Sequence, residues 1–313
     1  MRKFIVSDLH GNGEVYDSII SYLENISLIE DIELYINGDL IDRGLDSYRM
    51  LEDVIERINN PGKLRINYLA GNHELLMYRA LNPDPIMNFI DKESWSLNGG
   101  DLTISMLDSL DSAEEVKAKE QEFRNFLGKL EIYHEFEEKI GDNKLVLVHA
   151  TAPKEINTPC TMHLSDDDSY VYRAVWLRKE NRASGTFYPG KVISYNQIGK
   201  EGYFTIIGHT PVKDERGFSF DKEEKVLNID GGCVSYACGN FQYDKVPLVE
   251  VRNDHLEILV FNHNNEIVKG YYQDNEDTMN MGEKTLNERR IFISPSYANL
   301  GEISKERIKE YIR

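Results

Sequence analysis

The stretch that decides the fold is LYINGDLIDRG, residues 34–44. It opens with an apolar run typical of a buried strand, and Asp39, Asp42 and Arg43 follow where that strand would end. The same arrangement recurs as FIVSDLH at 4–10, INYLAGNHE at 66–74, LVLVH at 145–149 and FTIIGHT at 204–210. The carboxyl ends of the strands in an α/β sheet lie along one edge, where such folds bind ligands. The sequence therefore predicts that polar groups far apart in the chain meet at one rim.

The segments between the first three predicted strands have helical periodicity. Val15, Ile19 and Leu23 repeat at helical spacing, and a second apolar series runs from Tyr48 to Ile58. The sequence NNPG at 59–62 would end that second helix. A βαβαβ opening of this kind predicts parallel strands with helices outside them.

The alternation breaks over residues 82–131, which contain no strand ending in a chemical motif. NPDP at 82–85 opens the segment, NGG at 98–100 interrupts it, and residues 113–130 have the pattern of a charged helix. We expect a helical insertion near the site. The alternative is an ordinary packed helical pair with no role in function.

The rest of the chain has strand-like patterns. Residues 132–136 alternate and GDN at 141–143 turns the chain back, which predicts a hairpin. Strand-like segments at 248–251, 256–261 and 267–272 predict a second antiparallel sheet packed on the first. We expect residues 1–272 to form one domain. Residues 273–313 would pack on it as a polar loop, 273–290, and a short charged helix, 304–313.

Bulk properties narrow the classes of partner. A net charge of −18 repels nucleic-acid phosphate, and no Lys/Arg-rich run offsets it, so a long nucleic acid is a poor candidate. No apolar run is long enough for a membrane span, and residues 1–4 lead into a strand without the sections of a signal peptide. Cys160, Cys233 and Cys238 form no C-x-x-C pair, so we expect reduced thiols in a cytoplasmic protein.

The polar groups at the predicted strand ends suit a pair of divalent metals. Carboxylates, an amide and imidazoles without thiolates favour Mn²⁺, with Fe and Zn²⁺ as the other candidates. Arg43 offers a planar fork for phosphate oxygens, and Asp42 could hold a neighbouring histidine. Each motif alone has a structural alternative, such as a capped helix start or a hydrogen-bonded core histidine. Their fixed order, each at a strand end, favours the metal site.

The ordered set D-x-H, G-D-x-x-D-R-G, G-N-H-E, H and G-H-T resembles the metallophosphoesterase superfamily. It is most similar to the phage and bacterial branch of the phosphoprotein phosphatases, which holds serine/threonine protein phosphatases and symmetrical diadenosine tetraphosphate hydrolases. The resemblance covers residues 1–250 and includes WSLNGG at 95–100 and NIDGGC at 228–233. It implies a four-layer α/β/β/α sandwich with a helical insertion. Ser7 departs from the glycine that many relatives carry, and Ala150-Thr151 from their Ala-Gly.

The same resemblance implies a role for each residue. The first metal would be held by Asp8, His10 and Asp39, and the second by Asp39, Asn72, His149 and His209, with Asp39 as the bridge. His73 would be the proton donor, positioned by Asp42. Phosphate would be bound by Arg43, Asn72 and a second arginine, for which we choose Arg178 in VWLR at 175–178, with Arg173 as the runner-up. A metal-bridging hydroxide would attack phosphorus directly, without a covalent phosphoenzyme.

The expected activity is hydrolysis of phosphomonoesters, in the manner of a serine/threonine protein phosphatase. The substrate would be a phosphorylated small molecule, phosphopeptide or phosphoprotein. One alternative is a dinucleoside polyphosphate hydrolase whose nucleoside pocket is partly formed by the insertion, and another is a phosphodiesterase acting on cyclic nucleotides. From a different class, the chain could be an inactive metal- and phosphate-binding scaffold. The complete ligand set and His73 favour an enzyme.

Overall fold

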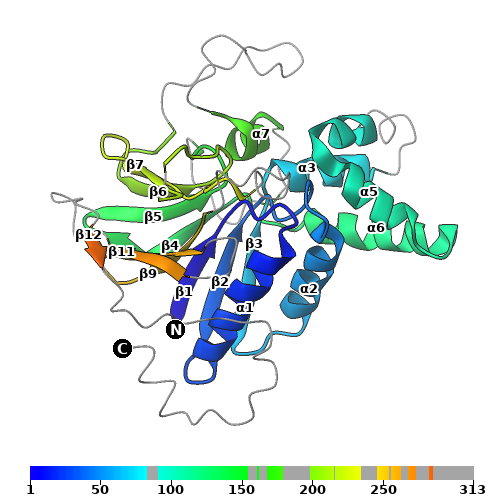
Figure 1. Cartoon of the computed structure of the whole chain (residues 1–313). Coiled ribbons are helices and arrows are strands. Elements are labelled where there is room, and N and C mark those ends of the chain that lie inside the picture. Colours follow the sequence, from blue (N-terminus) through cyan, green and yellow to red (C-terminus); the bar gives the residue numbers. More distant parts are fainter. Residues whose placement is uncertain are drawn as a thin grey trace.

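The computed structural model describes residues 1–82, 91–153, 161, 168–178, 198–214, 216–233, 245–253, 255–261, 267–272 and 282–284. Two mixed β-sheets lie face to face, with helices on their outer sides (Figure 1). This is the expected α/β/β/α sandwich. The core between the sheets is apolar and includes Ile5 and Val249 of one sheet and Leu147 and Ile206 of the other.

The first sheet opens as predicted. Strands β1 (Arg2–Val6), β2 (Ile32–Asn37) and β3 (Leu64–Leu69) pair in parallel and in chain order. Helices α1 (Gly13–Ser27) and α2 (Ser47–Asn59) connect them and cover the outer face (Figure 1). Helix α2 ends at Asn59, where the sequence places its stop signal.

The expectation for the last strands is wrong. Strands β9 (Val246–Val251), β10 (Leu256–Phe261), β11 (Ile267–Tyr272) and β12 (Gly282–Lys284) extend the first sheet instead of forming a second one. β9 pairs antiparallel with β1. The Arg2 guanidinium links β1 to β9 by donating to both carboxylate oxygens of Glu250, at 2.6 and 2.9 Å. The reason for the wrong expectation is that a strand pattern specifies which face is buried but not which strand is the partner. A second difference is that β12 lies in a segment predicted as loop.

The second sheet comes from the middle of the chain. The predicted hairpin forms between β4 (Tyr133–Ile140) and β5 (Asn143–Val148). β6 (Tyr203–Ile207) pairs in parallel with β5 and with β8 (Val226–Asn228), and β7 (Ser219–Asp221) completes the sheet. Helix α7 (Asp168–Trp176) lies beside this sheet (Figure 1), and Ala150 N donates to its Ala174 O at 2.7 Å.

The described part of the insertion is helical, as expected. A helical turn at 91–95 continues into a π-helix (Ser96–Gly100), then α5 (Asp101–Asp108) and α6 (Ala113–Leu127) follow. α6 ends three residues before the predicted position. There the backbone N–H groups of Lys129 and Leu130 donate to Phe126 O and Leu127 O in i→i−3 turns, in place of helical i→i−4 bonds. It packs on α3 (Asn72–Ala80), where Arg124 Nη1 donates to Tyr78 O at 2.6 Å.

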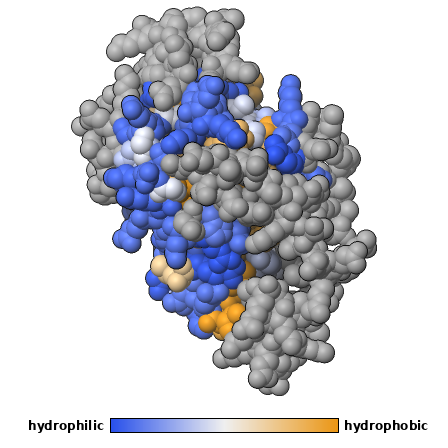
Figure 2. Space-filling view, turned by 90° about the vertical axis from the view of Figure 1, so that its left-hand side faces the viewer, coloured by the Kyte–Doolittle hydropathy of each residue, from blue (hydrophilic) through white to orange (hydrophobic). Residues whose placement is uncertain are grey.

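Several expectations concern residues outside the described part of the chain. These are the helix at 304–313, most of the loop at 273–290, Cys160 and Cys238. The packing of residues 273–313 on the core therefore stays a prediction. Cys233 is buried, and Asn12 Nδ2 donates to its Sγ at 3.4 Å. Among the described helices none is both long and apolar enough to cross a membrane. The face drawn in Figure 2 is mostly hydrophilic where it is described.

Candidate metal centre and active site

The loops after the strands hold an unusual backbone conformation. Seven non-glycine residues among those described have positive φ, a region that side chains rarely occupy. Six of the seven are residues that the sequence places in the site: Asp8, His10, Asp39, Asp42, Arg43 and His209. Such backbone strain costs about 1–3 kcal/mol per residue and gathers at functional sites. The local strain thus marks the same rim as the sequence motifs.

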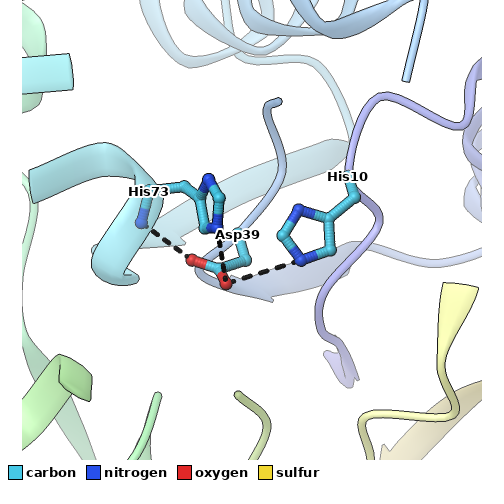
Figure 3. A group of neighbouring side chains, drawn as sticks. All are labelled: His10, Asp39 and His73. Atoms are coloured by element: carbon cyan, nitrogen blue, oxygen red, sulfur yellow. Dashed lines mark hydrogen bonds and ion pairs between the residues drawn. The ribbon is translucent and has the colours of Figure 1, made fainter. Parts of the chain in front are cut away.

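Asp39 lies at the centre of the site (Figure 3). Its Oδ2 is 3.5 Å from His10 Nε2 and 4.0 Å from His73 Nε2, while its Oδ1 accepts the His73 backbone N–H at 3.0 Å. On the other side Oδ1 is 3.4 Å from His149 Nε2. One carboxylate therefore faces imidazoles from both sheets.

Two groups of candidate metal ligands share Asp39. One contains His10 and His73, the other His149 and His209, and the ligand atoms within each group lie within 4.8 Å of one another. His209 Nδ1 is buried and has no hydrogen-bond partner among the described residues. A buried imidazole nitrogen without a partner is costly unless a ligand uses it. This donor set fits a pair of divalent metals.

Asp8 and Asn72 are brought to the same place with different contacts. Asp8 accepts the His209 backbone N–H on both carboxylate oxygens at 3.1 Å, and its Oδ2 is 2.5 Å from Ser7 Oγ. Asn72 Oδ1 is 3.3 Å from His149 Nε2. The group of candidate ligands on the first side contains His73 and does not contain Asp8. The role of Asp8 as a ligand stays a prediction.

Glu74 is a buried carboxylate that joins two of the loops. It accepts backbone N–H groups from Asp39 and Gly71 at 2.8 Å and from Leu40 at 3.1 Å, and the Tyr68 hydroxyl at 2.6 Å. A side chain on Gly71 would collide with the Asp39 carboxylate. The glycine and the glutamate of G-N-H-E thus fix the position of Asp39.

His73 is paired with Asp42 as the resemblance implies. His73 Nδ1 is 2.7 Å from Asp42 Oδ2, and both side chains are fully buried. His73 Nε2 is buried and has no hydrogen-bond partner among the described residues. Since Nδ1 is engaged by the carboxylate, Nε2 is the nitrogen left for chemistry at the site.

A pocket of about 270 Å³ opens over this centre. Arg43 and Arg178 line it together with His10, Asp39, Asn72 and His209, and the other lining residues are Asn98, Trp176, Pro211 and Asp230. Arg43 Nη1 lies 2.9 Å from His10 Nε2, and Arg178 Nη2 donates to His209 O at 3.1 Å. Arg173 is buried instead, and its Nε donates to Ala152 O at 2.9 Å. Arg178 therefore lies at the pocket, and its choice over Arg173 as the second phosphate arginine stays a prediction.

The histidines have opposed electrostatic environments. Burial lowers the pKa of His149, but Asp39 and Asp8 outweigh it and raise the pKa to about 10. Burial lowers the pKa of His10 and of His209 well below the usual value, and His149 adds to the effect on His209. Burial would raise the pKa of Asp39, yet His149 and His73 hold it well below its usual range. The pKa values of the ionisable groups on one side of the site therefore depend on the groups of the other side.

Four pocket residues were not singled out as site residues from the sequence. Asn98 and Asp230 lie in the WSLNGG and NIDGGC stretches, which did signal them. Trp176 lies in the segment used to choose Arg178. Pro211 follows the last histidine motif, and nothing in the sequence marked it. Burial of Asp230 raises its pKa to about 6.

Comparison with known proteins identifies the family. The model of the calcineurin-like phosphoesterases matches residues 1–244, so the chain belongs to this family of phosphoesterase hydrolases. The chain is similar to the asymmetrical bis(5'-nucleosyl)-tetraphosphatase PrpE of Bacillus cereus, with 26% identity over 243 residues that cover 75% of this chain and 87% of that protein. The enzyme of the same name from Bacillus thuringiensis is 25% identical with the same coverage.

Solved structures with related folds have low sequence identity. A protein serine/threonine phosphatase from Saccharomyces cerevisiae has a TM-score of 0.45 at 16% identity and covers 84% of this chain and 80% of its own. A cold-active protein-tyrosine phosphatase from a Shewanella species has a TM-score of 0.44 at 15% identity, with coverages of 82% and 77%. The family assignment rests on the match over residues 1–244.

Proposed function

We propose that this phosphoesterase hydrolyses phosphomonoesters at the centre around Asp39. The observation that carries the proposal is one buried carboxylate shared by two ligand groups, beneath a pocket lined by two arginines. A shared carboxylate suits a two-metal site, and paired guanidinium groups suit a phosphoryl group.

The residues that would hold the metals are those of the sequence-based assignment. Asp8, His10 and Asp39 would hold one ion, and Asp39, Asn72, His149 and His209 the other. Bound there, two divalent ions would supply Lewis-acid activation of water and neutralise charge on the phosphoryl oxygens. Oxygen and imidazole donors favour Mn²⁺, with Fe and Zn²⁺ as the other candidates.

The side chains of the pocket have separate tasks. Arg43 and Arg178 donate to the phosphoryl oxygens, and Asn72 helps to orient the group. Water attacks phosphorus while the bond from phosphorus to the leaving oxygen breaks. The leaving oxygen keeps the bonding electron pair and takes a proton from His73 Nε2. Asp42, at Nδ1 of the same ring, orients the imidazole for this transfer.

The substrate class follows from the size of the pocket and the charge of the chain. A pocket of about 270 Å³ admits a phosphoryl group with a small carrier. A net charge of −18 opposes long polyanions. An insertion that narrows the approach to the site would favour compact or flexible carriers. We therefore propose phosphoserine- and phosphothreonine-bearing peptides and small phosphomonoesters as substrates. The cytoplasmic location, expected from the few cysteines of the chain, stays a prediction.

A second candidate is hydrolysis of dinucleoside tetraphosphates. It is favoured by the activity for which the Bacillus relatives are named and by Trp176, which lines the pocket and stacks on Tyr172 with ring centroids 5.9 Å apart. An aromatic surface beside a phosphate site can bind a nucleobase by stacking.

One substrate panel tests both candidates. Values of kcat/KM are compared at one ionic strength, with Mn²⁺ added, for a phosphoserine peptide, an aryl phosphate, diadenosine tetraphosphate and a short RNA. The monoester proposal expects the first two to be preferred and the RNA to remain intact. A much higher value for diadenosine tetraphosphate would install the second candidate, and the chromatographic ratio of its products would show which bond is cut. If no ester is hydrolysed, the scaffold alternative holds.

A further inference from the structure

The inserted segment, residues 91–108, reaches the loop that carries Asp42 and Arg43. We propose that Trp95 and Thr103 of this segment are positioning residues, which hold the Asp42 carboxylate and through it orient the imidazole of His73. The inference rests on the proposed function, in which His73 donates the proton. It gives the insertion a part in the chemistry, in place of an ordinary packing role.

Three donors converge on the Asp42 carboxylate. Trp95 Nε1 donates to Oδ2 at 2.7 Å, Thr103 Oγ1 donates to Oδ1 at 2.7 Å, and His73 Nδ1 is 2.7 Å from Oδ2. All four side chains are at most 1% exposed. Without water to replace a lost donor, any rotation of the carboxylate leaves a buried oxygen unsatisfied. The Asp42 side chain is therefore held in one orientation.

The contacts from the inserted segment are specific rather than incidental. The hydroxyl of a threonine within a helix usually bonds a carbonyl of the preceding turn, whereas the Thr103 hydroxyl in α5 donates across to Asp42. Indole nitrogen can only donate, and that of Trp95 is also directed at Asp42. Gly100 makes room for this indole, since a side chain on Gly100 would collide with the ring. Trp95 and Gly100, the W and the second G of WSLNGG, thus both contribute to the contact with Asp42.

The orientation of Asp42 determines where His73 presents Nε2. With Nδ1 against the carboxylate, Nε2 faces Asp39 Oδ2 at 4.0 Å. When the phosphorus–oxygen bond breaks, the leaving oxygen retains the electron pair and takes the Nε2 proton, while Asp42 still holds the ring at Nδ1. A shift of Asp42 would move Nε2 away from the leaving oxygen. Displacements on the order of 1 Å cost about a hundred-fold in rate.

The inserted segment also contacts the phosphate arginine. The backbone N–H of Arg43 donates to Gly99 O at 2.9 Å. Gly99 has φ 99°, and a side chain there would approach Arg43 Cγ to 2.7 Å. The same short segment therefore holds two consecutive residues of the G-D-x-x-D-R-G motif.

A matched pair of variants tests the Thr103 contact. Thr103→Val removes the hydroxyl and keeps the shape, whereas Thr103→Ser keeps the hydroxyl. With a phosphoserine peptide, whose alkoxide leaving group needs a proton, Thr103→Val is expected to lower kcat about ten- to a hundred-fold, the range for lost orienting hydrogen bonds. With 4-nitrophenyl phosphate, whose leaving group needs none, kcat should stay nearly unchanged. Thr103→Ser should restore the peptide rate.

The control is Thr205→Val in β6. Thr205 is fully buried, and its hydroxyl has no hydrogen-bond partner in the described part of the chain, so the same change should leave both rates unchanged. Trp95→Phe removes the other donor and should show the same leaving-group dependence as Thr103→Val. An equal loss on both substrates in Thr103→Val and Trp95→Phe would mean a general structural role and would overturn the proposal, as would no loss at all.

A measurement that does not require catalytic turnover tests the positioning role independently of the proposed function. The proton on His73 Nδ1 should give a downfield ¹H NMR resonance, assigned by its loss in His73→Gln. In Thr103→Val and Trp95→Phe this resonance should shift or broaden, and in Thr205→Val and Thr103→Ser it should remain. If the wild-type chain hydrolyses no phosphoester, the proposed function fails while these spectra still decide the positioning. An unchanged resonance in Thr103→Val and Trp95→Phe would refute it.

Discussion

The two halves of the site are built in different ways. The first half comes from consecutive parallel strands of one sheet and is fixed by buried polar side chains, with Glu74 holding Asp39 and with Trp95 and Thr103 holding Asp42. The second half, His149 and His209, follows β5 and β6 of the other sheet. Two contacts of these histidines lead back to the first half. His149 Nδ1 lies 2.7 Å from Asn37 O, and His209 N donates to Asp8.

The difference indicates that the first half holds its own carboxylates in place, whereas the second half is positioned partly by contacts with the first. The first half's carboxylates Asp39 and Asp42 accept hydrogen bonds from groups of the same sheet and its insertion. The second half depends on partners across the gap between the sheets, and the pKa of His149 is raised to about 10 by Asp39 and Asp8 of the first half. Substitutions of groups in the first half that contact the second should therefore affect both halves of the site, whereas substitutions in the second half should have more local effects.

Asp39→Asn should have the largest effect, because this carboxylate is the only group shared by the two candidate ligand groups in the described part of the chain. Loss of a bridging carboxylate should release or scramble both metals and lower kcat/KM by about a thousand-fold or more, since metal activation contributes several kcal/mol. Metal content by mass spectrometry and the rate with an aryl phosphate measure this. Retention of two ions with native activity would refute the bridging role.

His73→Gln should come next, because it removes the proposed proton donor and leaves the shared carboxylate of Asp39 in place. Loss of a general acid costs about a hundred- to ten-thousand-fold. The decrease in kcat should be large for a phosphoserine peptide and small for 4-nitrophenyl phosphate, while metal content stays at the wild-type level. A metal analysis on the same preparation is the control. Equal losses on both substrates, or loss of a metal, would identify His73 as a ligand in the group that it forms with His10 and Asp39.

Arg178→Ala tests the second half. Arg178 lines the pocket and bonds His209, so its loss should raise KM and weaken inhibition by inorganic phosphate by about ten- to a hundred-fold, as expected for hydrogen bonds to a charged group. Arg173→Lys is the matched control, since Arg173 is buried beside Ala152. It should leave KM and phosphate inhibition near the wild-type values. The reverse pattern would make Arg173 the phosphate arginine.

Ser7→Gly should have the smallest effect. It removes the hydroxyl that lies 2.5 Å from Asp8 Oδ2. Orienting partners of metal ligands contribute about ten-fold or more to affinity, and the His209 N–H bonds would still hold Asp8. We expect a loss of metal affinity near that lower figure, measured by competition with a chelator. Unchanged metal affinity would show that the His209 N–H of the second half is enough to orient Asp8.

Much of the fold could be predicted from the sequence, because local patterns determine where its strands and helices form. Apolar runs followed by polar motifs located β1, β2, β3, β5 and β6, and helical periodicity located α1 and α2. The hairpin of β4 and β5 followed from a local turn. The strands after residue 246 were recognised as strands but placed in the wrong sheet, because alternation does not specify which edge a strand joins.

The candidate site divides in the same way. The sequence by itself gave the order and chemistry of its residues, because each motif follows a strand and parallel strands bring their carboxyl ends to one rim. Only the tertiary structure decided which atoms meet: Asp39 between two groups of histidines, Arg178 rather than Arg173 at the pocket, and Trp95 and Thr103 on Asp42. Such contacts join residues far apart in the chain, and only the packing of the two sheets and the insertion determines their distances.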